Sequence, residues 1–157
     1  MHLPPAPSST DRLQGVSVLI VEDDGSSARL ASAIVAQAGC DVRVVATAEE
    51  ALALLAVFSA DVVVTDVMLA QMNGFELARR IKADTRTREA IVIAVTASLE
   101  PSFESLAVES GCAVLLQKPL QAATVTGTLA DLLEQRGVVA NGGCAEAFRQ
   151  LNGGEFR

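Results

Sequence analysis

The sequence predicts an α/β domain with a five-stranded parallel sheet and helices on both of its faces. Five short apolar runs, rich in β-branched residues, have the length of strands. They occupy residues 16–21, 41–45, 61–65, 90–95 and 113–117. A segment with helical periodicity follows each run, so strands and helices alternate along the chain. This alternation, with strands that are apolar on both faces, is typical of a doubly wound parallel sheet.

The first helix is expected at residues 26–38, after the strand VSVLIV and three acidic residues. Gly39 follows at the position where a glycine commonly ends a helix. The apolar residues of this segment recur at helical spacing: Leu30, Ile34, Val35 and Ala38. Since they share one face, we expect that face to pack on the sheet.

Capping signals mark the starts of the second and third helices. Thr47 and Glu50 have the spacing of a capping box at the start of a helix over residues 47–58. Asn73 and Glu76 repeat this spacing ahead of the next helix. The apolar stripes are Ala51, Leu54, Leu55 and Phe58 in the second helix and Phe75, Leu77 and Ile81 in the third.

The last two helices are predicted from a proline, a glycine and a long amphipathic segment. The fourth helix is expected to begin near Pro101, because proline is favoured at the first helical position, and to end before Gly111. A fifth helix is expected from residue 121 to residue 135.

The length favours one domain between two flexible ends. A chain of 157 residues fits a single hydrophobic core, which we place at residues 16–136. Residues 1–15 are rich in proline and serine and are predicted to be disordered. Residues 137–157 contain two Gly-Gly pairs and are expected to be flexible or to hold a short helix at 145–151.

Composition excludes several classes of function. The formal net charge is −7 and the twelve Lys and Arg residues are scattered, which argues against nucleic-acid binding and favours a protein partner or a cation. No run approaches the roughly 18 apolar residues of a membrane span, and no signal peptide is recognisable, so a cytoplasmic protein is expected. Cys40, Cys112 and Cys144 are far apart and are predicted to stay reduced.

Acidic residues follow the ends of the first and third strands. Glu22, Asp23 and Asp24 come directly after the first strand, and Asp66 follows the third. A strand order of 2-1-3-4-5 makes these two strands neighbours and brings the acids to one crevice. Adjacent carboxylates repel one another unless a cation is present, and Mg²⁺ prefers carboxylate oxygens. The pattern therefore predicts a Mg²⁺ site, whereas Asp24 is expected to cap the first helix.

Three side chains of this crevice have the chemistry of phosphoryl transfer. Asp66 has a carboxylate that can act as a nucleophile and form an aspartyl phosphate. Thr96 and Lys118 follow the fourth and fifth strands. A hydroxyl and an ammonium group can bind the oxygens of a transferred phosphoryl group, where negative charge spreads in the transition state.

Four stretches together resemble the receiver domain of two-component response regulators, in the CheY-like superfamily, and the resemblance covers residues 16–136. They are VLIVEDD, VVVTDVMLAQMNGFEL, AVTA and LLQKPL. The resemblance implies a flavodoxin-like fold with the strand order given above. It also implies that Asp66 is the phosphoacceptor, Thr96 the switch hydroxyl and Lys118 the cation that pairs with phosphate. For Mg²⁺ it implies Asp23 as a direct ligand, Glu22 as a ligand through water and the backbone carbonyl of Met68 as a further ligand. The peptide bond between Lys118 and Pro119 is expected to be cis.

The chain departs from the family pattern at two positions. Many receivers have a proline four residues after the phosphoacceptor, where this chain has Ala70. Leu115 stands three residues before the lysine, where the family usually has the aromatic residue that follows the switch hydroxyl inward. The second departure predicts a switch without an aromatic rotation.

The resemblance implies a phosphorylation-dependent signalling module, not an enzyme beyond catalysing its own aspartate phosphorylation and dephosphorylation. The expected partners are a histidine kinase or a histidine phosphotransfer protein and a downstream protein target, with no nucleic acid or membrane, and the expected state is a monomer or weak dimer. The expected switch face comprises the fourth helix, fifth strand and fifth helix.

Three alternatives stay open at this point. The chain could be a receiver module cut from a hybrid histidine kinase, or a receiver that binds a partner without taking phosphate. It could also be a dehalogenase-like phosphatase, but that family needs a second acid two residues after the nucleophile, where this chain has Met68.

Overall fold

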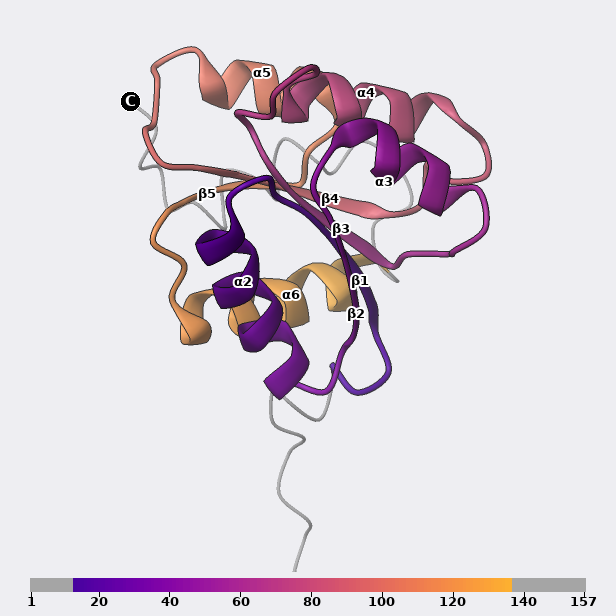
Figure 1. Cartoon of the computed structure of the whole chain (residues 1–157), viewed down its shortest axis with the longest axis vertical. Coiled ribbons are helices and arrows are strands. Elements are labelled where there is room, and N and C mark those ends of the chain that lie inside the picture. Colours follow the sequence, from indigo (N-terminus) through magenta and orange to yellow (C-terminus); the bar gives the residue numbers. More distant parts are fainter. Residues whose placement is uncertain (1–12, 137–157) are drawn as a thin grey trace, which may run out of the picture.

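Five parallel strands form the centre of the protein in a computed structural model that describes residues 13–136 (Figure 1). The strands are β1 (Ser17–Val21), β2 (Asp41–Val45), β3 (Val62–Asp66), β4 (Ile91–Thr96) and β5 (Val114–Gln117). They pair in the order β2-β1-β3-β4-β5, as the sequence predicts. The register sets Val21 beside Thr65, so the carboxyl ends of β1 and β3 are neighbours.

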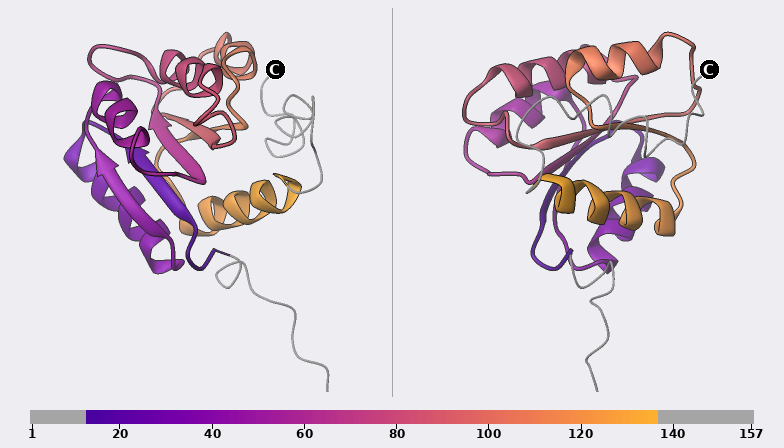
Figure 2. Two further views of the ribbon diagram at one scale, coloured as in Figure 1. Left: turned by 90° about the vertical axis from the view of Figure 1, so that its right-hand side faces the viewer. Right: turned by 180° about the vertical axis from the view of Figure 1, so that it is seen from behind.

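Helices cover both faces of the sheet (Figures 1 and 2). They are α2 (Gly25–Gln37), α3 (Ala48–Leu55), α4 (Gly74–Ala83), α5 (Phe103–Ser110) and α6 (Ala122–Arg136). Helices α2 and α6 pack on one face and α3, α4 and α5 on the other. The doubly wound architecture predicted from the alternation of elements is therefore confirmed.

Alternate residues of the strands supply the two layers of the core. In β1, Leu19 and Val21 belong to the layer under α3–α5, whereas Val18 and Ile20 belong to the layer under α2 and α6. The prediction of strands apolar on both faces holds for β1, β3 and β4. It is wrong for β2, an edge strand in which Val44 is 45% exposed.

The predicted caps begin three helices. The carboxylate of Asp24 accepts a hydrogen bond from the Ser27 N–H, which fixes the start of α2. The Thr47 hydroxyl and the Asn73 side-chain oxygen accept the corresponding bonds at the starts of α3 and α4. Each bond satisfies a backbone N–H group that has no partner within the helix.

Four details differ from the sequence predictions. Helix α5 begins at Phe103, so Pro101 lies in the preceding turn and not at the first helical position. Helix α3 ends at Leu55, and Phe58 lies beyond it beneath the guanidinium of Arg43, 5.1 Å from the ring centre. Leu30 is 45% exposed, although it shares the apolar periodicity of α2.

The fourth difference concerns the start of the domain. Leu13 falls within the predicted disordered leader, but it is fully buried in the core layer under α2 and α6. The N–H of Gly15 also donates to the carbonyl of Gly39, which ties the turn before β1 to the end of α2. The domain thus includes residues 13–15. The rest of the predicted leader and the tail at 137–157, with the short helix expected at 145–151, lie outside the described residues.

The described residues contain no helix that is long and apolar enough to cross a membrane. Cys40 and Cys112 have free thiols, as predicted, and Cys144 lies outside the described part of the chain. Burial raises the pKa of the Cys112 thiol to about 11.

Candidate phosphoryl-acceptor site

The carboxyl ends of the strands bring the predicted site residues to one edge of the sheet. Asp66 is the last residue of β3 and Thr96 the last residue of β4, while Glu22 directly follows β1. Lys118 directly follows β5, and its N–H donates to the carbonyl oxygen of Thr96 at 2.8 Å. Parallel pairing therefore positions residues that are distant in the sequence.

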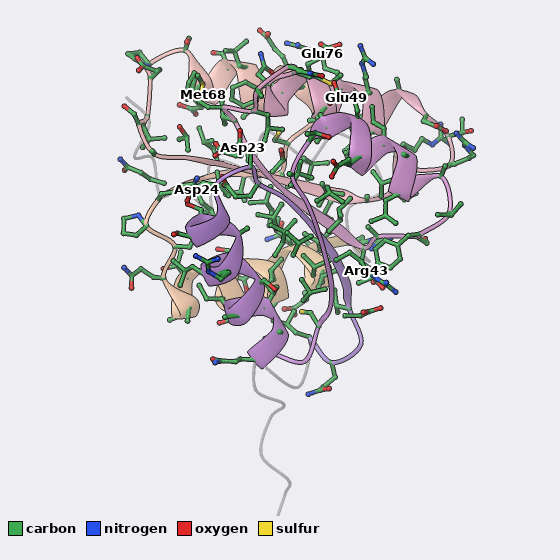
Figure 3. The ribbon with its side chains drawn as sticks, viewed as in Figure 1. Asp23, Asp24, Arg43, Glu49, Met68 and Glu76 are labelled. Atoms are coloured by element: carbon green, nitrogen blue, oxygen red, sulfur yellow. The ribbon has the colours of Figure 1, made fainter. Side chains whose placement is uncertain are left out.

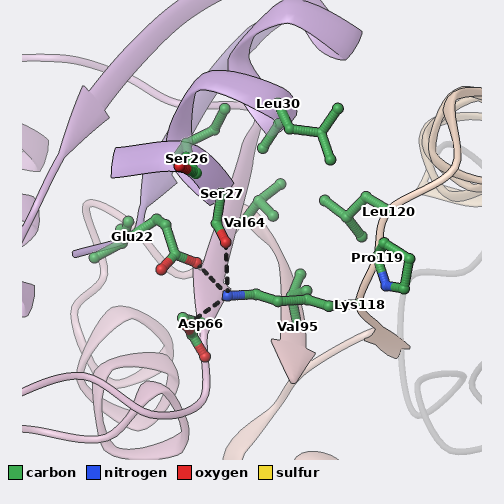
Figure 4. Close-up of a pocket in the computed structure, with 13 residues that line it drawn as sticks. Glu22, Ser26, Ser27, Leu30, Val64, Asp66, Val95, Lys118, Pro119 and Leu120 are labelled. Atoms are coloured by element: carbon green, nitrogen blue, oxygen red, sulfur yellow. Dashed lines mark hydrogen bonds and ion pairs between the residues drawn. The ribbon is translucent and has the colours of Figure 1, made fainter. Parts of the chain in front are cut away.

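Lys118 is the cation at the centre of this edge (Figure 4). Its Nζ atom lies 2.8 Å from Glu22 Oε2 and 2.9 Å from Asp66 Oδ2. The hydroxyl oxygen of Ser27, in the first turn of α2, is a third neighbour at 3.4 Å. The sequence predicted that a cation must offset the crowded acids, and the ammonium group of Lys118 partly does so.

Backbone N–H groups hold the remaining oxygens of the two buried carboxylates. The Asp24 N–H donates to Glu22 Oε1 at 3.1 Å. The Met68 N–H donates to Asp66 Oδ1 at 3.0 Å. Each carboxylate is thus oriented by one ion pair and one backbone hydrogen bond, which is a precondition for a nucleophile in a defined position.

Burial and the ion pairs shift two pKa values at the site. Burial raises the pKa of Glu22 above its usual value, although the hydrogen bonds from Lys118 and the Asp24 N–H oppose this. For Lys118, burial lowers the pKa, but the hydrogen bonds and charges of Glu22 and Asp66 outweigh it and the pKa is raised. The ammonium group therefore stays protonated at neutral pH.

The acidic residues fit a hard divalent cation. One carboxylate oxygen from each of Glu22, Asp23 and Asp66 lies within 4.8 Å of the others. Glu22 and Asp66 are buried, whereas Asp23, which lies just beyond the end of β1, is exposed (Figure 3). Three carboxylates and one ammonium leave two negative charges, which one Mg²⁺ would balance, and oxygen is the ligand that Mg²⁺ prefers.

Met68 and Thr96 make other contacts in this structure than those their predicted roles require. The Met68 side chain is 68% exposed, and the main-chain role that the structure gives this residue is donation to Asp66. Its carbonyl as a metal ligand stays a prediction. Thr96 is 2% exposed and its hydroxyl donates to the Ser98 carbonyl at 2.9 Å. Within the described residues, no hydrogen bond joins this hydroxyl to Asp66 or Lys118.

Two further residues shape the site without having been predicted to do so. Ser27 contacts Lys118, and nothing in its sequence context indicated that contact. Gly74 begins α4, and a Cβ atom there would collide with the carbonyl oxygen of Asp66. The Asn-Gly pair before a predicted helix was the available signal for Gly74, because glycine permits close backbone approach.

Of two features beyond the charged residues, one agrees with the family resemblance and the other is a departure from it. The Lys118–Pro119 peptide bond is cis, as the resemblance implies. Leu115 is 1% exposed and belongs to the core layer under α3–α5. The position of the usual aromatic residue is therefore filled by a packed aliphatic side chain.

Comparison with known proteins identifies a family that covers most of the domain. A family model for the response regulator receiver domain matches residues 18–130. Among curated proteins, ethylene receptor 2 of Arabidopsis thaliana is 27% identical over 135 residues, which is 82% of this chain and 17% of that protein. The transcriptional regulatory protein AfsQ1 of Streptomyces coelicolor is 30% identical over 119 residues, 76% of this chain and 52% of that protein. The chain thus spans about half of these relatives or less.

Solved structures match the fold over nearly their whole length. The chemotaxis response regulator CheY4 of Vibrio cholerae has a TM-score of 0.71 at 26% identity, covering 76% of this chain and 99% of that one. The signal receiver domain of a histidine kinase from Syntrophus aciditrophicus also has a TM-score of 0.71 at 26% identity, with 82% and 96% of the two chains covered. The similarity therefore includes both a chemotaxis response regulator and a receiver domain of a histidine kinase.

Proposed function

The chain belongs to the response regulator receiver domain family, and on that basis we propose that it is a signalling module that takes a phosphoryl group onto Asp66. Receiver domains are signalling modules and not classical enzymes. The observation that carries the proposal is the position of the Asp66 carboxylate, 2.9 Å from Lys118 Nζ and within 4.8 Å of the oxygens of Glu22 and Asp23. A nucleophile, a phosphate-binding cation and acidic metal ligands thus meet at one edge of the sheet.

The phosphoryl donor is a phosphohistidine on a histidine kinase or a histidine phosphotransfer protein. A carboxylate oxygen of Asp66 attacks the phosphorus atom, an O–P bond forms and the P–N bond of the donor breaks. The imidazole nitrogen keeps the electron pair and takes up a proton. Lys118 remains close to the acceptor and offsets negative charge on the phosphoryl oxygens.

The residues that would hold Mg²⁺ are Glu22, Asp23, Asp66 and the carbonyl of Met68. When bound, the ion would supply positive charge that stabilises the transferring phosphoryl group. Asp23 suits this role because its exposed carboxylate needs little desolvation to reach a hydrated ion.

Thr96 is the residue that responds to the phosphoryl group on Asp66. Its hydroxyl donates to the Ser98 carbonyl in the unmodified protein, so binding a phosphoryl oxygen requires that bond to be exchanged. The exchange would move the loop between β4 and α5 and alter the surface formed by α5, β5 and α6. Position 115 holds a buried leucine and not an aromatic residue. The conformational response to phosphorylation therefore passes through changes in side-chain packing and not through the rotation of an aromatic ring.

We place the receiver domain at residues 16–136, and the turn that contains the buried Leu13 extends it at its start. We expect the protein to be a cytoplasmic monomer or weak dimer. Its expected downstream target is a protein. The similar proteins include a receiver domain of a histidine kinase and a transcriptional regulatory protein, so a stand-alone regulator and a receiver module of a larger protein, such as a hybrid kinase, both fit this proposal.

Acetyl phosphate with Mg²⁺, followed by intact-mass measurement, separates the three candidate functions. A phosphoacceptor gains about 80 Da. A partner-binding receiver without phosphorylation gains nothing, and a phosphatase turns over phosphoester substrates without a lasting adduct. Asp41→Asn, at an exposed position on the edge strand β2, is the matched control for Asp66→Asn and should label like the wild type.

A further inference from the structure

A cavity of about 330 Å³ lies beside the acceptor site, between α2 and the loop from β5 to α6 (Figure 4). Apolar side chains make most of its wall, among them Ile20, Leu30, Val64, Val95, Pro119 and Leu120. Ile20 and Val95 are buried in the core, whereas Leu30 is 45% exposed. The cavity therefore extends from the protein surface to the face of the sheet.

Short side chains on α2 leave this space open. Ser27 and Ala31 lie one helical turn apart and both line the cavity. Residues with this spacing share a helix face, so two small side chains together leave a gap between the helix and the sheet. Larger residues at these positions would fill the cavity with their own atoms.

The polar end of the cavity is already satisfied by internal contacts. Lys118 Nζ contacts Glu22, Asp66 and Ser27, and the second oxygens of the two carboxylates accept backbone hydrogen bonds. Within the described part of the chain, every buried side-chain nitrogen or oxygen has a hydrogen-bond partner. An anionic ligand would meet two carboxylates and one ammonium group at this end, and any charged ligand would lose hydration against the apolar wall, which is costly.

We propose that this cavity is a binding site for a small, uncharged and mainly apolar molecule. An apolar cavity of about 150 Å³ accepts benzene, so a space of about twice that volume suits a fused bicyclic ring. Ligand pockets are commonly apolar with a few polar groups and begin at about 300 Å³. The proposal goes beyond phosphoryl transfer, because neither that chemistry nor metal binding uses the apolar wall.

A methyl NMR titration with three naphthalene probes tests both the site and the ligand class. The probes are 2-naphthol, the anion 2-naphthoate and the cation 2-naphthylmethylammonium, which share one ring system. We expect 2-naphthol to shift the methyl signals of Ile20, Val64 and Leu120, and the two ions to bind at least about tenfold more weakly. Absent or scattered shifts, or equal binding of the ions, would overturn the proposal.

Variants that fill the cavity provide a second test of the proposed binding site. Ala31→Leu should reduce 2-naphthol affinity at least about tenfold by occupying the space. Ala53→Leu is the matched control, since Ala53 is exposed on α3 on the opposite face of the sheet, and it should bind like the wild type. If Ala31→Leu does not fold, Ser26→Trp at the exposed rim takes its place. Unchanged affinity in the folded variant contradicts the assignment of the cavity.

Discussion

Lys118 and Asp66 form an ion pair of 2.9 Å although 52 residues separate them in the chain. The pair exists because β5 and β3 end at the same edge of the sheet and β4 lies between them. Glu22 shares the same ammonium at 2.8 Å from the end of β1. One cation thus ties together the ends of three strands, and the stability and chemistry of this edge depend on it.

Lys118→Met should destabilise the protein in metal-free buffer. The substitution leaves the buried carboxylates of Glu22 and Asp66 without their cation, and we expect a loss of about 1–3 kcal/mol in the free energy of unfolding. Urea denaturation in EDTA and in Mg²⁺ measures the loss, which should be smaller with Mg²⁺.

Arg86→Met is the control for this experiment. Arg86 pairs with Asp84 at the surface, with its side chain 70% exposed, and such pairs contribute little. If Lys118→Met loses no more free energy of unfolding than Arg86→Met, the contacts of Lys118 with Glu22 and Asp66 do not stabilise the fold.

Asp23→Asn should weaken Mg²⁺ binding without lowering stability in EDTA. Removing one of three crowded carboxylates relieves repulsion, so the melting temperature in EDTA should equal or exceed that of the wild type. The increase in melting temperature on adding Mg²⁺ should shrink, because less ion binds the folded state. Asp41→Asn serves as the distant control, and a lower melting temperature of Asp23→Asn in EDTA would argue against crowded acids.

Alanine at two glycines should have opposite effects on stability. Gly74→Ala places a Cβ atom against the carbonyl oxygen of Asp66 and should cost about 1–3 kcal/mol of unfolding free energy. Gly127→Ala lies in α6 with open space around the new Cβ atom, and alanine should stabilise this helix by up to about 1 kcal/mol. Chemical denaturation compares the two, and equal effects would refute the close approach at Gly74.

Phosphorylation should change the order or packing of residues 121–136. Helix α6 contains Thr124, Val125, Thr126, Gly127 and Thr128 in succession, all poor helix formers. The hydroxyl of Thr126 also bonds back to the carbonyl of Ala122, which competes weakly with the helical pattern. A helix of this kind is easy to reposition through Thr96, Lys118 and the turn at Pro119.

Amide hydrogen exchange with and without beryllium fluoride plus Mg²⁺ measures this response. Protection in residues 121–136 should change together with that of the loops after Asp66 and Thr96. A response confined to the two loops, with α6 protected equally in both states, would mean that the signal leaves through another surface.

Local and topological rules predicted most of the fold and the identity of the crowded acids. Asp24, Thr47 and Asn73 cap helices as their spacing indicated, because capping depends on a few neighbouring residues. The meeting of Glu22 with Asp66 followed from the strand order alone.

What the sequence did not predict depends on tertiary contacts. Leu13 is buried because it packs in the core layer under α2 and α6, and no periodicity in a Pro- and Ser-rich segment signals that contact. The periodicity of α2 could not show that Leu30 lies over a cavity instead of core side chains. The contact between Ser27 and Lys118 joins residues 91 positions apart, so it depends on how α2, which packs on β1 and β2, lies relative to the loop after β5.

The central claim is that Asp66 is the phosphoacceptor, and the most direct test is to locate the modified side chain. After labelling with acetyl phosphate and Mg²⁺, borohydride reduces an aspartyl phosphate to homoserine, which peptide mass spectrometry assigns to a position. The account predicts homoserine at position 66, and no homoserine in Asp66→Asn. Homoserine at another aspartate, or labelling that persists in Asp66→Asn, would contradict it.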